Sequence, residues 1–179
     1  MTLRDALEEI MKGLVSDLQK SLIDQGHNLT GRLHDSIVYE VDQDGTTMVG
    51  RVLIEEYGVF VEAGVTADKI PFDPSRKKGQ GGGGKSQYIQ GLVRFWEHRG
   101  LSGREAVSAA FATARIHKRE GMPSSNSFGY SSTGERTGFI RTVLDDSIPK
   151  ISKMLEEKYL ATVQLQLADA FRSERSTVK

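Results

Sequence analysis

The stretch YGVFVEAG, residues 57–64, lies where an alternating strand pattern ends and a long glycine-rich segment begins. Two aromatic residues and two valines are interleaved here with two glycines and one carboxylate. This mixture is typical of a tightly packed turn between structural layers rather than of a solvated loop. The stretch contains no obvious nucleophile, metal-ligand cluster or phosphate-binding loop. It therefore predicts architecture rather than chemistry.

The N-terminal segment predicts an amphipathic helix over residues 2–24. Its apolar residues recur at spacings of three and four, which is the period of one helical face: Leu3, Leu7, Ile10, Leu14, Leu18 and Leu22. Thr2 and Asp5 have the spacing of a capping box, and Gly26 follows the last apolar position as a stop signal.

A β-hairpin is predicted after a linker over 28–37. Residues 37–42 alternate between apolar and polar, Asp44 and Gly45 supply a turn, and alternation resumes over 48–54. Residues 57–62 favour either a third strand or a short helix, because their two glycines leave both open.

A flexible loop is predicted over 64–87, where prolines, basic residues and a run of glycines replace apolar residues. A helical insertion over 88–120 follows. Its second helix is predicted to begin at Ser102, with Glu105 completing a capping box.

The last apolar run, over residues 139–172, has the helical period but contains Pro149. We expect a break or a kink there, with Ser147 capping a second helical segment that has Pro149 in its first turn. Together these elements predict one α+β domain over residues 1–179.

Composition narrows the classes of function. The net charge is zero, which argues against a dedicated nucleic-acid binder but permits a local basic patch. The chain has no cysteine, so disulfides and thiolate metal sites are excluded. No apolar run approaches the ~20 residues that span a bilayer, so we expect neither a signal peptide nor a membrane anchor.

Two motifs suggest alternative functions. Residues 79–86 match the phosphate-loop pattern G-x-x-x-x-G-K-S, which would make Lys85 and Ser86 the centre of a nucleotide hydrolase. A phosphate loop follows a buried strand, and residues 69–78 do not have that character, so a flexible linker is favoured. The helices of residues 88–119 have helix-turn-helix dimensions, but the alanine-rich second helix favours packing over DNA reading.

The remaining polar residues predict no catalytic, cofactor or metal site. The four histidines lack metal-ligand spacing. Four basic residues in the glycine-rich segment are candidate contacts for DNA phosphates or an acidic partner: Arg76, Lys77, Lys78 and Lys85.

The order of these parts resembles the head-tail joining, tail-completion and minor tail-component proteins of the neck of long-tailed bacteriophages. Residues 31–37, GRLHDSI, are similar to the G-x-L-x-x-S-I pattern before that family's first strand, and residues 57–64 to its Y-x-x-x-x-E-x-G-T stretch. Residues 109–123 resemble the helix before G-x-P in longer members, and residues 138–140 the F-I segment of the closing helix. Val65 stands where the family usually has threonine.

The resemblance implies an α+β fold, in which an antiparallel sheet of about three to five strands packs against a long C-terminal helix and the N-terminal helix. It also implies a structural, non-enzymatic virion protein. It implies a homo-oligomeric ring, expected to be a hexamer, between the portal or adaptor and the tail-tube or tail-terminator proteins. Non-specific contact with packaged DNA, assembly in the host cytoplasm and no membrane association are also expected. Within residues 57–64, we expect Tyr57 and Phe60 to anchor sheet-to-helix packing, Glu62 to fix the turn by pairing, and Gly64 to release the chain into an arm.

Overall fold

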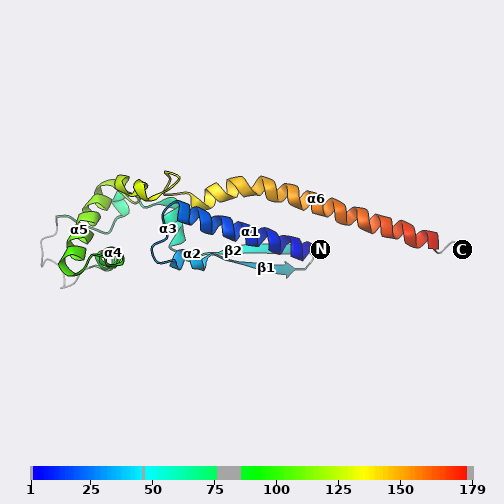
Figure 1. Ribbon diagram of the computed structural model, residues 1–179, viewed down its shortest axis with the longest axis horizontal. Helices are drawn as coiled ribbons and strands as arrows, with labels where there is room; N and C mark the ends of the chain where they lie inside the picture. The colour runs from blue at the N-terminus through cyan, green and yellow to red at the C-terminus, as the bar shows by residue number, and fades with distance from the viewer. Residues whose placement is uncertain (1, 46, 76–85, 177–179) are drawn as a thin grey trace. The chain divides into compact units, whose positions relative to one another are not determined.

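The computed structural model describes residues 2–45, 47–75 and 86–176. The chain's contacts separate it into two compact units. The hairpin unit comprises Met1–Ser21, Asp35–Ile54 and Ile140–Lys179, and the helical unit comprises Leu22–His34 and Glu55–Phe139. The prediction of a single domain stays a prediction. The elements, labelled in Figure 1, are α1 (Leu3–Asp24), α2 (Arg32–Ser36), β1 (Val38–Asp44), β2 (Thr47–Leu53), α3 (Gly58–Ala63), the 3-10 helix η1 (Ala67–Lys69), α4 (Gln87–His98), α5 (Gly103–Glu120), the 3-10 helix η2 (Ser125–Tyr130) and α6 (Phe139–Ser176).

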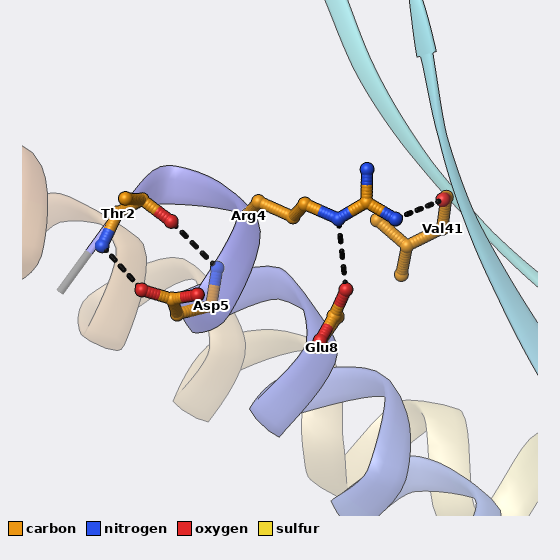
Figure 2. Close-up of polar contacts among 5 residues, drawn as sticks. All are labelled: Thr2, Arg4, Asp5, Glu8 and Val41. Atoms are coloured by element: carbon orange, nitrogen blue, oxygen red, sulfur yellow. Dashed lines mark hydrogen bonds and ion pairs between the residues drawn. The ribbon is translucent and has the colours of Figure 1, made fainter.

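Helix α1 begins with the predicted capping box. The Asp5 N–H donates to Thr2 Oγ1 over 3.2 Å, and the Thr2 N–H donates to Asp5 Oδ2 over 2.7 Å (Figure 2). These bonds satisfy two backbone donors that the first turn leaves without helical partners. One turn further, Arg4 pairs with Glu8 at 2.9 Å and reaches the Val41 carbonyl of β1 (Figure 2).

Strands β1 and β2 form the predicted hairpin. They pair antiparallel, with Tyr39 opposite Val52 and Val41 opposite Gly50. Gly50 faces α1, because a Cβ added there would lie 2.6 Å from the Met11 sulfur. On the outer face, Val38 and Leu53 are exposed. The hairpin therefore buries one face on α1 and leaves the other open.

Helix α6 is continuous from Phe139 to Ser176, so Pro149 does not break it and Ser147 does not begin a second helix. The alternative of a kink at Pro149 stays a prediction. Pro149 and Asp145, the residue whose carbonyl loses its helical donor, are both exposed, so water can satisfy that carbonyl. Lys158 pairs with Glu9 of α1 at 2.9 Å. At 1.5 Å per residue α6 is about 57 Å long, and it continues beyond the N-terminal end of α1 (Figure 1).

The helical unit is organised by a stripe of small residues on α5. Ala106, Ala110 and Ala114 are spaced by four residues, and each is 0% exposed. They let α4 approach closely, where Trp96 Nε1 donates to Thr113 Oγ1 over 3.0 Å. Ser102 is the N-cap of α5 as predicted, but its side chain makes no capping bond, so the predicted capping box is not formed.

Residues 58–63 form helix α3, which resolves the choice between strand and helix. Directly after it, Val65 and Met122 exchange two backbone hydrogen bonds of 2.7 Å each. The crossing requires glycine on both segments of the backbone. Gly64 and Gly121 have φ of 72° and 87°, and an added Cβ would lie 2.6 Å from the carbonyl oxygens of Met122 and Val65 respectively.

The structure confirms the α+β class, with an antiparallel sheet of two strands in the described residues. The sheet of about three to five strands is not shown. The start of the predicted 64–87 loop is well packed, because Val65 is paired and Ile70 is only 2% exposed. Residues 76–85 lie outside the described residues. Within the part that is described, no helix combines bilayer-spanning length with the required apolar character.

Candidate binding cavity in the helical unit

The helical unit contains a cavity of about 420 Å³. Its lining comes from five separate stretches of the sequence: residues 26–29, 57–65, 92–99, 113–117 and 122–136. The crossing of Val65 and Met122 lies in its wall, so the two glycines that permit the crossing also position the cavity.

The cavity is apolar inside and at its mouth. Val61, Leu92, Phe95 and Met122 contribute to the wall. Four further lining residues are strongly exposed: Phe60 by 63%, Tyr130 by 54%, Leu29 by 41% and Tyr57 by 39%. Exposed aromatic and aliphatic groups around a concave site are typical of a binding surface.

Arg99, the C-cap residue of α4, supplies the first positive charge. Its guanidinium carbon lies 4.3 Å from the ring centre of Tyr130 and 4.8 Å from that of Phe95. These distances are within the range of cation–π attraction. The two rings therefore hold the guanidinium in the lining of the cavity.

Arg136 supplies the second positive charge. Its Nη1 donates to the Gly26 carbonyl over 3.2 Å, and its backbone carbonyl accepts a 3.0 Å hydrogen bond from His27 Nε2. Its Nε is buried and has no hydrogen-bond partner among the described residues. Burial lowers the pKa of Arg136, and the nearby charge of Arg99 lowers it further.

Two histidines also line the cavity, and burial lowers the pKa of each. For His27, the Arg136 charge acts in the same direction. His117 Nδ1 lies 2.8 Å from the hydroxyl of Tyr88, whose pKa is raised by burial to about 12. The phenol therefore stays protonated at neutral pH and shares this hydrogen bond with the imidazole.

The charged side chains that line the cavity are positive, with no negative charge among the described lining residues. None of the described residues that line it is an aspartate or a glutamate. Neither Arg99 nor Arg136 has an ion-pair partner in the described ranges. The arrangement thus combines two uncompensated guanidiniums with apolar walls, which suits binding of an apolar group that carries negative charge.

Three of the four residues singled out in 57–64 line this cavity: Tyr57, Phe60 and Gly64. Tyr57, the N-cap residue of α3, and Phe60 within it are exposed by 39% and 63%, and the expectation that they anchor sheet-to-helix packing stays a prediction. Glu62 is not among the lining residues. Its backbone carbonyl accepts a 2.8 Å hydrogen bond from the Gly138 N–H, and the predicted side-chain pairing stays a prediction.

Gly64 does not simply release the chain. It ends α3, with its N–H donating to the Phe60 carbonyl over 2.9 Å, and it makes the close approach to Met122 possible. The four predicted basic contacts, Arg76, Lys77, Lys78 and Lys85, lie outside the described residues, as does the phosphate-loop pattern up to Lys85. The described residues just before it, 70–75, contain no strand, and Ser86 instead caps α4 by accepting from the Ile89 N–H.

Sequence reasoning missed Arg99, Arg136, His27 and Tyr130 as lining residues. They come from separate segments, and no local spacing connects them. The only usable signal was an arginine directly after a helix and another in a serine- and glycine-rich turn, which is too common to indicate a site.

Within the described ranges, no group of three or more His, Asp or Glu side chains is placed to hold a metal ion. Comparison of the chain with protein-family models, curated proteins and solved structures finds no match.

Proposed function

We propose that the chain is a structural protein of the bacteriophage neck that forms a homo-oligomeric ring at the head-tail interface. The observation that carries the proposal is that each unit exposes apolar side chains on a surface of its own. In the helical unit these are Tyr57, Phe60 and Tyr130 at the cavity mouth. In the hairpin unit they are Val38 and Leu53 on the hairpin and Tyr159 and Leu160 on α6.

A ring that joins other proteins needs apolar surfaces for its neighbouring copies and for the proteins that it joins. We assign the hairpin and α6 surfaces to the neighbouring copies, and the cavity mouth to a joined protein. In a head-to-tail ring each copy uses one surface to contact the next copy and a different surface to contact the previous one. Apolar patches on a soluble chain are removed from water when such contacts form. The mechanism we propose is therefore interface complementarity, without a catalytic step.

The hairpin offers a second kind of contact. In the described residues β1 and β2 pair only with each other, so each has an open edge. A strand from a neighbouring copy could pair with either edge. This would extend the sheet to the three to five strands that the resemblance implies.

The finer assignments rest on the resemblance stated above. We propose a hexamer that joins the portal or adaptor to tail-tube or tail-terminator proteins in the virion, after assembly in the host cytoplasm. Arg76, Lys77, Lys78 and Lys85 would contact packaged DNA through phosphates, independent of base sequence.

The mass of the purified full chain tests the proposal, measured alone and mixed with portal and tail-tube proteins and compared with negative-stain images. We expect one discrete ring mass, and a loss of ring formation in the double variant Tyr159→Glu, Leu160→Glu. Ser152→Asp, an exposed polar site on the same helix, is the control and should still assemble. A chain that stays monomeric in all mixtures would overturn the proposal.

A nucleotide hydrolase and a DNA-binding module remain testable alternatives. Micromolar ATP binding with magnesium that Lys85→Ala abolishes would favour the first. Tight, salt-sensitive binding of duplex DNA by the isolated chain would favour the second.

A further inference from the structure

We infer that the cavity of the helical unit binds a segment of a partner protein in which a carboxylate lies next to an aromatic or large aliphatic side chain. This inference rests on the proposed function, because it names the chemistry of a protein segment that would join the chain to its neighbours. Three features of the cavity lead to it: its charge, its apolar surface, and the extent of that surface beyond the cavity itself.

The charge selects an anion. Arg99 and Arg136 both line the cavity, and none of the described lining residues offsets them with a carboxylate. Arg136 uses Nη1 for the Gly26 carbonyl, while its Nε is buried without a partner in the described residues. A carboxylate reaching these guanidiniums would form charge-assisted hydrogen bonds, which are the strong class in proteins.

The apolar wall excludes a bare inorganic anion as the best occupant. Phosphate or sulfate has no apolar group that could contact the side chains of Val61, Leu92 and Phe95. An aromatic or aliphatic side chain beside the carboxylate would cover these groups and remove them from water, which stabilises the complex in proportion to the apolar surface buried. The best fit is therefore amphipathic, with the apolar group inside and the carboxylate at the arginines.

The mouth favours a polypeptide over a small molecule. Phe60, Tyr130, Leu29 and Tyr57 are all more than a third exposed, so apolar surface continues outward from the cavity. A small ligand that fills the cavity would leave much of these four side chains in water, whereas a chain segment would run across them. This surface is of the kind that other proteins recognise.

The chain's own glycine-rich segment is a poor occupant on charge. Residues 76–85 contain Arg76, Lys77, Lys78 and Lys85 and no aspartate or glutamate. Placing these cations beside Arg99 and Arg136 would be repulsive. The occupant is accordingly assigned to a partner with an acidic and apolar segment.

The probe for this inference is a library of random 12-residue peptides displayed for selection on the full-length protein. Selection against the variant Arg99→Gln removes peptides that bind elsewhere. We expect the selected peptides to share Asp or Glu beside Phe, Tyr, Trp or Leu. A synthesised peptide should then bind at least about tenfold more tightly than its Asn or Gln counterpart, as expected for loss of a hydrogen bond to a charged group.

Matched variants locate the binding site. Arg99→Gln and Arg136→Gln should each weaken the peptide at least about tenfold, whereas Arg104→Gln, an exposed arginine in the same unit outside the cavity, should not change its affinity. Trp96 fluorescence checks that each variant is folded. Arg99→Gln decides the question if Arg136→Gln unfolds, because the Arg99 guanidinium contacts the rings of Phe95 and Tyr130 and makes no hydrogen bond to the backbone of the described residues.

Several outcomes would overturn the inference. These are the absence of any peptide that prefers wild type over Arg99→Gln, selected peptides without acidic residues, and 3-phenylpropionate binding tightly while no peptide is selected. A selected peptide that matches this chain and blocks ring formation would assign the occupant to a second copy instead. Ring mass is measured separately: rings without peptide binding remove only this inference, whereas peptide binding without rings removes the proposed ring and leaves the cavity assignment.

Discussion

The hairpin unit and the helical unit meet the same geometric demand in different ways. Gly50 in the hairpin unit and Gly121 in the helical unit would each place an added Cβ 2.6 Å from another atom. At Gly50 that atom is the sulfur of Met11, at the end of a flexible side chain. At Gly121 it is the Val65 carbonyl oxygen, which belongs to the backbone. The Met11 side chain can move to make room for an added Cβ at Gly50, whereas the backbone at Val65 cannot move without breaking its pairing with Met122.

The kind of contact explains the difference. The hairpin unit is held by periodic side chains of α1 and by ion pairs at its surface, such as Lys158 with Glu9. The helical unit depends on backbone contacts, half-buried histidines and hydrogen bonds such as Tyr88 with His117. The cavity therefore lies in the more rigidly specified part of the chain, as preorganised binding requires.

The largest effect is expected from Gly121→Ala. A positive φ costs an L-residue about 1–2 kcal/mol, and the clash with the Val65 carbonyl adds about 1–3 kcal/mol. We expect the free energy of unfolding to fall by about 3 kcal/mol, measured by denaturant unfolding with Trp96 fluorescence, which reports on the helical unit. Gly134→Ala is the control, because its φ is 78° and an added Cβ meets nothing within 4 Å. Equal losses for both variants would contradict the role of the crossing.

Lowering the pH is expected to destabilise the helical unit reversibly, by less than Gly121→Ala. All four histidines lie in the helical unit. Burial lowers the pKa of His27 and His117 below the ordinary 6.5, so the unfolded chain binds protons that the folded unit does not. Their stabilising contribution is complete above pH 6.5 and declines as the pH falls through the folded values.

Melting followed by Trp96 fluorescence at pH 7.5 and 5.5 tests this. The midpoint should be lower at pH 5.5, where the carboxyls of Asp68 and Glu120, whose pKa values are lowered from 3.8 and 4.5, do not yet titrate. His27→Gln, which can still donate to the Arg136 carbonyl, should reduce the difference. The exposed His98→Gln should leave it unchanged. A midpoint that rises on acidification would refute the assignment.

The smallest effect is expected from Gly50→Ala. The Met11 side chain can rotate away, and alanine is better than glycine within a strand by roughly 0.5–1 kcal/mol. We expect the free energy of unfolding, followed by circular dichroism, to change by less than about 1 kcal/mol. If Gly50→Ala lowered the free energy of unfolding as much as Gly121→Ala does, the two units would tolerate an added Cβ equally poorly.

Local sequence patterns were sufficient for most of the elements. The period of Leu18 and Leu22 predicted α1, the alternation around Asp44 and Gly45 predicted the hairpin, and Thr2 with Asp5 predicted the cap. Pro149 misled because its effect depends on whether the freed carbonyl faces solvent, which the sequence does not state.

The cavity could not be predicted in this way. Arg99 and Arg136 become neighbours only because α4 and the turn before α6 meet across the unit, and Phe60 reaches the mouth only because 58–63 is a helix. These are consequences of long-range packing, which a periodic pattern does not encode. Gly64 and Gly121 lie at the crossing beside the cavity, but the sequence does not show that they approach the carbonyls of Met122 and Val65.

The paired backbones of Val65 and Met122 also close a loop. They bring together the two ends of the segment that contains η1, α4 and α5, so the chain enters and leaves this segment at adjacent positions. Because those ends are already fixed, each doubling of a connecting loop within the segment adds only about 0.6 kcal/mol of closure entropy. The loops that connect helices within this segment can therefore change length while Val65 and Met122 stay at hydrogen-bonding distance.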